Sequence, residues 1–244
     1  NASAYTAVDR AESEPDKANE INAEAPGLLA EEVRRIGALF VHYSTDYVFD
    51  GTKRSAYLED DAPNPLNVYG RTKLAGERAV QKAGGRYLIF RTSWVYGLHG
   101  NNFMRTILRL GQEKKDLRVV DDQVGAPTTS VVLARASRSA VDQLITKEWD
   151  YPHQWAGLYH MTCGGKTTWC RFAQAILTTT MGEDAPVVTG ICSDEYVTAA
   201  KRPKNSVLSN GKLLSRFGIS LPDWSLALNS VLTNYDTETI TTRN

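Results

Sequence analysis

The chain has 244 residues, and its 28 basic and 28 acidic side chains give a formal net charge of zero. A balanced surface argues against nucleic acid or an anionic membrane as the main partner, and no apolar run approaches the ~20 residues of a membrane span. The amino terminus lacks a signal-peptide pattern, and the three cysteines lack zinc-ligand spacing, so we predict reduced thiols in the cytoplasm and no protein metal site.

The first predicted elements are a helix and a strand. Helical composition runs over residues 14–35, with an interruption expected at Pro26. Residues 38–43 then form an apolar run of strand length. It ends in Ser44 and Thr45, whose hydroxyls would emerge at the carboxyl edge of a parallel sheet, where ligands bind in open α/β folds.

The next predicted helix, at residues 68–83, carries Tyr69 and Lys73 four positions apart, so their side chains share one face. The loop before it, residues 49–67, is rich in Asp, Gly and Pro, and a loop of this length beside a ligand site is more often functional than idle. An unperturbed phenol titrates near pH ~10, and a neighbouring cation lowers that pKa toward the range where proton transfer is efficient. Tyr69 would then serve as an acid; the alternative is an exposed helix with a packed Tyr.

Strands and helices continue to alternate in the rest of the chain. A strand at 86–91 precedes Trp94, and the polar loop 121–129 combines hydrogen-bonding capacity with Gly and Pro rigidity, the composition of a fixed binding loop. Thr129 or Ser130 would cap the helix after that loop. The remaining elements expected are a helix opening at 101–103, strands at 117–120, 158–161 and 187–191, helices at 131–145 and 168–177, and two terminal helices around Leu213 and Leu226.

Three strings carry a resemblance to a known family: STDYVFDG from Ser44, NVYGRTKLAGE from Asn67 and RTSWVYG from Arg91. In this order and spacing they resemble the extended short-chain dehydrogenase/reductase family, and the likeness runs nearly end to end. It implies an α/β fold, with a Rossmann-like doubly wound parallel sheet and a smaller C-terminal α/β substrate portion. Residues 1–150 would belong to the dinucleotide-binding domain and residues 151–244, together with the loop 121–129, mainly to the substrate portion, with an intertwined boundary.

The implied reaction is the NADPH-dependent reduction of the 4-keto group of dTDP-4-dehydro-L-rhamnose to dTDP-L-rhamnose, a step of sugar-nucleotide biosynthesis. By resemblance, Tyr69 protonates the developing alkoxide, and Lys73 lowers the pKa of Tyr69 and binds the cofactor ribose. Thr45 would hydrogen-bond the carbonyl oxygen of the substrate. Asn22, on the first helix, would complete a catalytic tetrad by holding a water that touches Lys73.

The resemblance also implies two sets of contact residues. Those for the cofactor are Ala4, Tyr5, Thr6, Tyr43, Tyr69, Lys73 and Thr92. Those for the sugar nucleotide are Thr45, Asp46, Trp94, Gln123, Thr128 and Arg202. Three of these have a structural alternative: Asp46 as the cap of an Asx turn, Trp94 as a packed ring and Arg202 as a solvated cation.

In this family a Gly-rich phosphate turn and two βα units precede the strand that residues 1–6 would end, and such units amount to roughly 60 residues. No such glycine motif follows a strand here, so the chain is expected to be a fragment of a longer protein, with an apolar sheet edge exposed. NADPH is the donor implied by resemblance, and NADH stays open.

Other readings stay open beside reduction. The chain could be a non-catalytic regulatory or binding relative, because a fold does not prove catalysis, or an inactive fragment. It could also be another sugar-nucleotide dehydratase or epimerase, in which Asp46 would supply an extra acid or base. Relatives are often dimeric, so a homodimer is the expected assembly; some are described with magnesium at a subunit interface, but this sequence predicts no such site.

Overall fold

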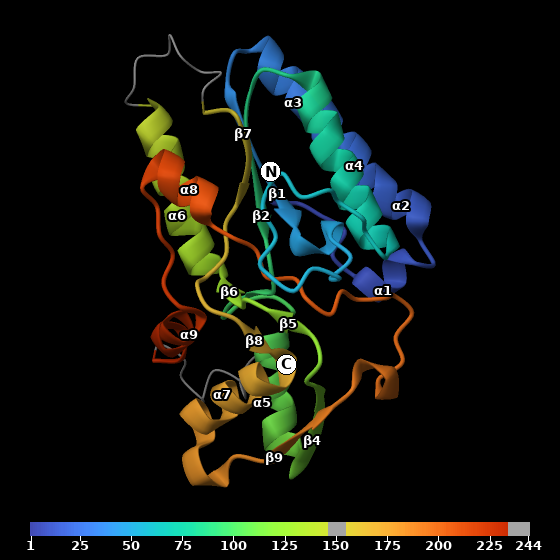
Figure 1. Ribbon diagram of the computed structural model, residues 1–244, viewed down its shortest axis with the longest axis vertical. Coiled ribbons are helices and arrows are strands. Elements are labelled where there is room, and N and C mark those ends of the chain that lie inside the picture. The colour runs from blue at the N-terminus through green and yellow to red at the C-terminus, as the bar shows by residue number, and fades with distance from the viewer. Residues whose placement is uncertain (146–154, 234–244) are drawn as a thin grey trace.

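A parallel three-stranded sheet forms the centre of the fold, as the computed structural model shows for residues 1–145 and 155–233 (Figure 1). Its strands are β1 (Leu39–Thr45), β2 (Arg86–Thr92) and β7 (Gly157–His160), in the order β1-β2-β7. Because the strands are parallel, their carboxyl ends meet at one edge, where Thr45 is paired with Thr92. Helices cover both faces, which confirms the predicted α/β class.

Two helices, α3 (Ala25–Arg35) and α4 (Val68–Ala83), cover one face of this sheet (Figure 1). The core between them and the strands consists of Ala30, Phe40, Val80, Ile89 and Leu158. The helix predicted at 68–83 is confirmed to the residue. β1 continues two residues beyond its predicted end, so Ser44 and Thr45 belong to the strand itself.

The interruption expected at Pro26 is wrong. The helix α2 (Pro15–Asn19) continues through a π-helical turn, η1 (Glu20–Glu24), directly into α3. Pro26 lies in the first turn of α3, where proline is tolerated. Because it has no N–H to donate to the carbonyl four residues earlier, the regular pattern fails within η1, which contains Asn22. Such π turns occur frequently at functional sites.

On the opposite face lie α6 (Ser130–Ile145) and α8 (Gly211–Phe217) (Figure 1). As predicted, Thr129 caps α6: its hydroxyl accepts from the backbone N of Val131 at 3.1 Å. The core on this side consists of Leu88, Phe90, Leu133, Ala136, Ala140, Tyr159, Met161, Leu213, Phe217, Ile219 and Leu221. The parallel sheet is thus buried on both faces, as parallel sheets generally are.

A smaller group of elements lies below the sheet in Figure 1. It comprises the parallel pair β4 (Asp116–Val120) and β9 (Val187–Ile191), with α5 (Phe103–Glu113), α7 (Trp169–Met181) and α9 (Trp224–Leu232). They share a core that includes Met104, Phe172, Ile176 and Leu228. The members of this group come from both sides of residue 150, and the division of the chain at that residue stays a prediction.

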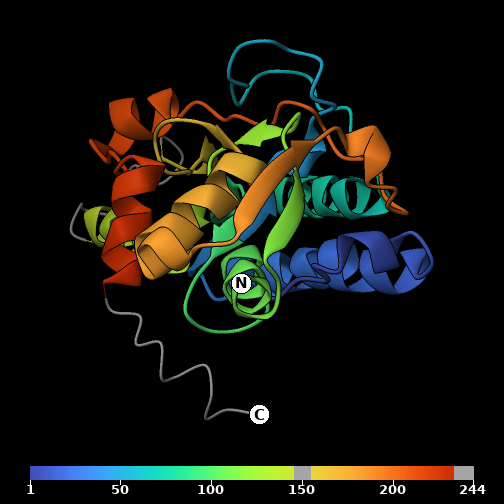
Figure 2. The ribbon, with the colours of Figure 1, turned by 90° about the horizontal axis from the view of Figure 1, so that it is seen from below.

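Short elements join the two parts of the molecule. β3 (Val95–Tyr96) pairs with β6 (Thr128–Thr129), and β5 (Val124–Gly125) pairs with β8 (Thr167–Thr168). The loop 49–67, cyan in Figure 2, is fixed by backbone hydrogen bonds of 2.8 Å that join Tyr57 to Val207 and Ser209. Among the described helices, none is both long enough and apolar enough to cross a membrane.

Candidate functional site

Thr45, the last residue of β1, lies at the carboxyl edge of the sheet beside its register partner Thr92. Its hydroxyl donates to Asp46 Oδ1 at 3.0 Å and accepts from the backbone N of Tyr47 at 3.1 Å. These contacts turn the chain out of the strand into the 3-10 turn η2 (Asp46–Val48). Thr45 is only 5% exposed, so packing fixes its hydroxyl at this edge.

The start of α4 is held by side chains from two other parts of the chain. Asn67 accepts from the backbone N of Gly70 at 2.8 Å, which caps the helix. Glu12 accepts from the backbone N of Val68 at 2.7 Å. Acceptors at both positions satisfy N–H groups that have no partner inside the helix. The first turn of α4, which carries Tyr69, is therefore fixed at the carboxyl edge of the sheet.

Tyr69 lies half-buried beside Tyr47, and the two rings meet edge-on with centroids 5.9 Å apart. This approach requires Gly70, because a Cβ there would lie 2.2 Å from the carbonyl oxygen of Tyr47. The Thr45 side chain lies close enough to the Tyr69 phenol to influence its pKa. Burial raises the pKa of Tyr69 to about 12; the Thr45 side chain reduces this shift and the nearby Asp46 adds to it.

Lys73 is buried one turn further along α4, and its Nζ donates to the carbonyl oxygen of Tyr43 at 2.6 Å. Burial lowers the pKa of Lys73 to about 8, while the Glu77 carboxylate opposes that shift. The expectation that Lys73 lowers the pKa of Tyr69 is wrong for this structure. The pKa of the phenol rises because its desolvation dominates over every favourable contact.

Asn22 is fully buried in η1, and its side chain makes three hydrogen bonds. Oδ1 accepts from the backbone N of Tyr5 at 2.8 Å, and Nδ2 donates to the backbone O of Tyr5 and to Thr72 Oγ1, both at 3.1 Å. A Cβ on Gly76 would lie 2.0 Å from the carbonyl oxygen of Asn22, so the backbone of η1 lies directly against α4. Asn22 thus binds the segment around Tyr5 to the helix that carries Lys73.

Asp46 is 2% exposed, accepts a hydrogen bond from the Thr45 hydroxyl and lies near the Ser206 hydroxyl. Its other carboxyl oxygen, Oδ2, has no hydrogen-bond partner among the described residues. Burial raises the pKa of Asp46 to about 7, and the two hydroxyls limit the rise. Near neutral pH this carboxyl can therefore either accept or donate a hydrogen bond to a ligand.

Arg202 lies half-buried where the segment 198–206 crosses α1 (Val8–Ala11). Its guanidinium makes two parallel bonds to Asp9, Nη1–Oδ1 at 3.1 Å and Nη2–Oδ2 at 2.6 Å, and it lies near the Tyr47 phenol. Arg202 is therefore an ion-paired cation near Tyr47 rather than a solvated one.

Trp94 follows β2 with a φ of 47°, a left-handed conformation that is rare for a residue other than glycine. Its ring stacks on that of Trp169, with centroids 3.5 Å apart and planes inclined by 8°. A Cβ on Gly125 would lie 2.5 Å from the Trp94 ring, so the loop 121–129 packs directly against this ring. Strained backbone of this kind concentrates at functional sites.

The loop 121–129 holds Gln123 and Thr128. Thr128 is fully buried, and its hydroxyl already accepts from the backbone N of Cys163 at 3.1 Å. Gln123 is also buried, next to Val124, whose backbone exchanges hydrogen bonds with residues 204–206. The loop is thereby connected to Ser206, which lies near Asp46.

The described residues fit the ribose and nicotinamide side of a dinucleotide. The Thr92 hydroxyl is buried at the carboxyl edge without a hydrogen-bond partner among the described residues, and the Lys73 ammonium lies on the neighbouring helix. Of the other predicted cofactor contacts, Tyr5 is held by Asn22, whereas Ala4 is half-buried and Thr6 exposed. Within residues 1–145 and 155–233, no three His, Cys, Asp or Glu side chains gather as metal ligands.

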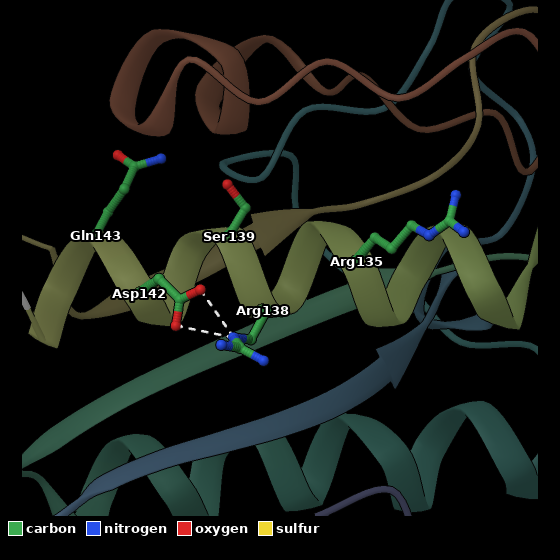
Figure 3. A pocket seen from close by; sticks show the side chains of 5 residues that line it. All are labelled: Arg135, Arg138, Ser139, Asp142 and Gln143. Atoms are coloured by element: carbon green, nitrogen blue, oxygen red, sulfur yellow. Dashed lines mark hydrogen bonds and ion pairs between the residues drawn. The ribbon is translucent and has the colours of Figure 1, made fainter.

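A surface hollow on α6 is separate from these residues (Figure 3). All five of its lining residues belong to this one helix: Arg135, Arg138, Ser139, Asp142 and Gln143. Two of them form an ion pair, in which Arg138 Nε lies 2.8 Å from Asp142 Oδ2. Because α6 covers the face of the sheet opposite α4, this hollow lies apart from Tyr69 and Lys73.

Sequence reasoning missed two residues of this site, Tyr47 and Asp9. Tyr47 could have been found, because it stands two positions after Thr45 and an aromatic ring at the end of a strand can line a ligand site. Asp9 gave no signal, because an acidic residue in a short helix is normally solvated. Only the fold brings it to Arg202, 193 positions away.

Comparisons with known proteins show the family of the chain. The profile of the family described as "RmlD substrate binding domain" matches residues 1–237. A curated dTDP-4-dehydrorhamnose reductase from Burkholderia thailandensis is 47% identical over 242 residues, which cover 93% of this chain and 78% of the relative.

Solved structures match in the same way. A dTDP-4-dehydrorhamnose reductase from Clostridium acetobutylicum superposes with a TM-score of 0.87 at 40% identity, over 95% of this chain and 78% of that one. One from Bacillus anthracis, solved in complex with NADP, gives a TM-score of 0.85 at 36% identity, over 96% and 79% of the two chains.

Proposed function

Because the chain belongs to the RmlD substrate binding domain family, we propose that it reduces the 4-keto group of dTDP-4-dehydro-L-rhamnose to give dTDP-L-rhamnose, with NADPH as the donor. The observation that carries this proposal is the proximity of the Thr45 side chain and the Tyr69 phenol where β1 ends and α4 begins, at the carboxyl edge of the sheet. The names of the curated relatives favour reduction over dehydration, epimerisation or a non-catalytic role.

Thr45 and Tyr69 bring two hydroxyl groups to one point. A substrate carbonyl oxygen between them would accept from both once the Thr45 hydroxyl turns away from Asp46 Oδ1, and Tyr69 would transfer its proton as that oxygen gains negative charge. The high pKa of Tyr69 keeps the phenol protonated before the reaction. Tyr69 is therefore the general acid in this proposal, and Thr45 orients the carbonyl.

Lys73, Tyr43 and Thr92 are the residues that would hold the cofactor. When bound, NADPH supplies the hydride. The Lys73 ammonium would donate to the ribose hydroxyls, and the carbonyl of Tyr43 fixes the position of that ammonium. Asn22 supports the same region by binding Tyr5 to α4, together with the flanking Ala4 and Thr6 of the predicted cofactor set.

The sugar nucleotide would lie along Asp46, Trp94 and Arg202. Asp46 offers a sugar hydroxyl the carboxyl oxygen that has no hydrogen-bond partner among the described residues, and Trp94 offers the apolar surface of its stacked ring. Arg202 supplies positive charge for the diphosphate, which would compete with Asp9 for the guanidinium. Gln123 and Thr128 would support the loop behind the nucleotide. A homodimer, a magnesium site between subunits and a cytoplasmic location remain predictions.

Replacement of the acid tests the proposal. In Tyr69→Phe we expect turnover to fall by about 10²- to 10⁴-fold, the usual contribution of a positioned general acid, while the free energy of unfolding changes little. Turnover is measured as the loss of NADPH absorbance with dTDP-4-dehydro-L-rhamnose as substrate. The matched control is Tyr87→Phe, because Tyr87 lies near the start of β2, away from the carboxyl edge.

Retention of turnover within a few-fold of the parent in Tyr69→Phe would remove Tyr69 as the acid. A parent protein that binds NADPH and the sugar nucleotide but never turns them over would favour the non-catalytic alternative instead.

A further inference from the structure

A buried ion pair lies directly behind the candidate site. Glu77 of α4 is 2% exposed and Arg91 of β2 is 3% exposed. Two parallel bonds join them, from Arg91 Nε to Glu77 Oε1 at 2.8 Å and from Arg91 Nη2 to Glu77 Oε2 at 2.7 Å. The hydroxyl of Ser44 in β1 also donates to Glu77 Oε1. One carboxylate thus connects the helix to two strands of the sheet.

Each member of this cluster is next to a residue of the site. Glu77 follows Lys73 by one helical turn, on the same face of α4. Ser44 immediately precedes Thr45, and Arg91 immediately precedes Thr92. The three contacts therefore fix the spacing between the helix that carries Lys73 and the strand ends that carry the two threonines.

The charge of the cluster also acts on Lys73. The side chains that interact electrostatically with Lys73 are Glu77 on its own helix and His42 on β1. Burial lowers the pKa of His42 to about 3, which keeps it neutral near pH 7. Glu77 is therefore the one of these two groups that favours the ammonium form of Lys73.

We propose that Glu77 is a positioning residue, which holds Lys73 charged and in place through its bonds to Ser44 and Arg91. This inference rests on the proposed function, because Lys73 has a role in catalysis only if the protein carries out that reaction. A purely structural ion pair would anchor α4 without controlling Lys73. If Glu77 is a positioning residue, replacement of its carboxylate by a neutral group should lower the pKa of Lys73. If the ion pair is purely structural, the same replacement should leave the pKa of Lys73 unchanged.

The experiment measures the proton affinity of Lys73 directly, without substrate or cofactor. The protein is produced with ¹³C-labelled lysine, Lys73→Arg identifies the Lys73 signal, and NMR follows that signal with pH. The parent should titrate near its lowered pKa of about 8. In Glu77→Gln we expect the midpoint to fall by about one unit, the effect of losing one neighbouring opposite charge.

Glu77→Gln leaves Arg91 buried and unpaired, which can prevent folding. The double variant Glu77→Gln/Arg91→Gln removes both charges and is predicted to show a smaller fall in the Lys73 midpoint, because loss of the Arg91 cation offsets part of the effect. The control is Glu113→Gln, which breaks an exposed pair of the same type between Arg109 and Glu113 on α5 and should leave the midpoint unchanged. A folded double variant with the parental midpoint would overturn the proposal, whether or not the protein proves to be a reductase.

Discussion

Three ionisable side chains of the site, Asp46, Tyr69 and Lys73, are shifted toward their neutral forms by burial. The pKa of Asp46 rises to about 7, that of Tyr69 rises to about 12 and that of Lys73 falls to about 8. Desolvation is the largest cause in all three cases. Proton occupancy in this site is therefore controlled by how tightly the surrounding segments close over it.

Asp46 should make stability depend on pH in an unusual direction. Its folded pKa of about 7 lies above the ordinary value of 3.8, so the folded protein binds more protons than the unfolded chain between these values. Its contribution to the free energy of unfolding is therefore fully present below pH ~4 and is lost as the pH rises through ~7. Asp46→Asn removes this pH-dependent contribution. From pH ~5 to ~8 the free energy of unfolding of the variant should therefore rise by about 3 kcal/mol relative to that of the parent.

Urea unfolding of parent and variant at the two pH values measures this difference. Asp184→Asn serves as the control, because Asp184 is exposed and its replacement should give the same difference at both values. If the free energies of unfolding of Asp46→Asn and of the parent changed in parallel with pH, the Asp46 carboxyl would have to be ionised in the folded protein at both pH values.

For single residues, the sequence predicted where the side chains of the site lie, but it did not predict how deeply they are buried. The spacing of Tyr69 and Lys73 and the strand end at Thr45 located these residues correctly at the carboxyl edge of the sheet. The direction of the Tyr69 pKa shift could not be predicted, because it depends on how deeply the phenol is buried beside Tyr47. That burial results from contacts between segments far apart in the chain.

The decisive contact between elements is the one between η1 and α4. Gly76 permits it, because any Cβ there would lie 2.0 Å from the carbonyl oxygen of Asn22. We expect Gly76→Ala to lower the free energy of unfolding by about 1–3 kcal/mol, since a backbone atom cannot move aside as a flexible side chain can. Displacement of η1 should also weaken NADPH binding, because Asn22 holds Tyr5.

Chemical denaturation and NADPH titration of the variant measure these two effects. Gly211→Ala is the matched control: Gly211 opens α8, and the nearest atom to its Cβ would be Ser209 Oγ at 3.4 Å, an ordinary contact. A stable Gly76→Ala protein with parental NADPH affinity would show that η1 and α4 separate at little cost.

The element boundaries illustrate why local patterns succeed or fail. The helix at 68–83 was predicted to the residue, because Asn67 is a strong cap and Gly84, with a φ of 72°, ends it. The helix at 14–35 was read wrongly at Pro26, because a proline can stop a helix or stand in its first turn. The choice depends on the π turn before it, which is stabilised by tertiary contacts with α4.

Two buried histidines should make the whole molecule sensitive to acid. Burial lowers the pKa of both His42 and His160 from 6.5 to about 3. The unfolded chain then binds more protons than the folded one below pH ~6.5, so the stability present above that value is lost as the pH falls toward ~3. Between pH ~6.5 and ~5 each histidine should reduce the free energy of unfolding by about 1.5 kcal/mol.

Over this pH interval the free energy of unfolding should fall by about 3 kcal/mol less in the double variant His42→Gln/His160→Gln than in the parent. Guanidinium unfolding at both pH values provides the comparison, with His99→Gln as a control at an exposed position. Equal losses in the parent and the double variant would assign the acid sensitivity to other groups.

The paired indoles of Trp94 and Trp169 connect the two parts of the molecule. Trp94 follows β2 of the central sheet, and Trp169 begins α7 of the smaller group. Rings that lie 3.5 Å apart and nearly parallel share their electronic excitation, and such coupling is lost as soon as the rings separate. The circular dichroism signal of the unlabelled protein therefore reports whether its two parts are in contact.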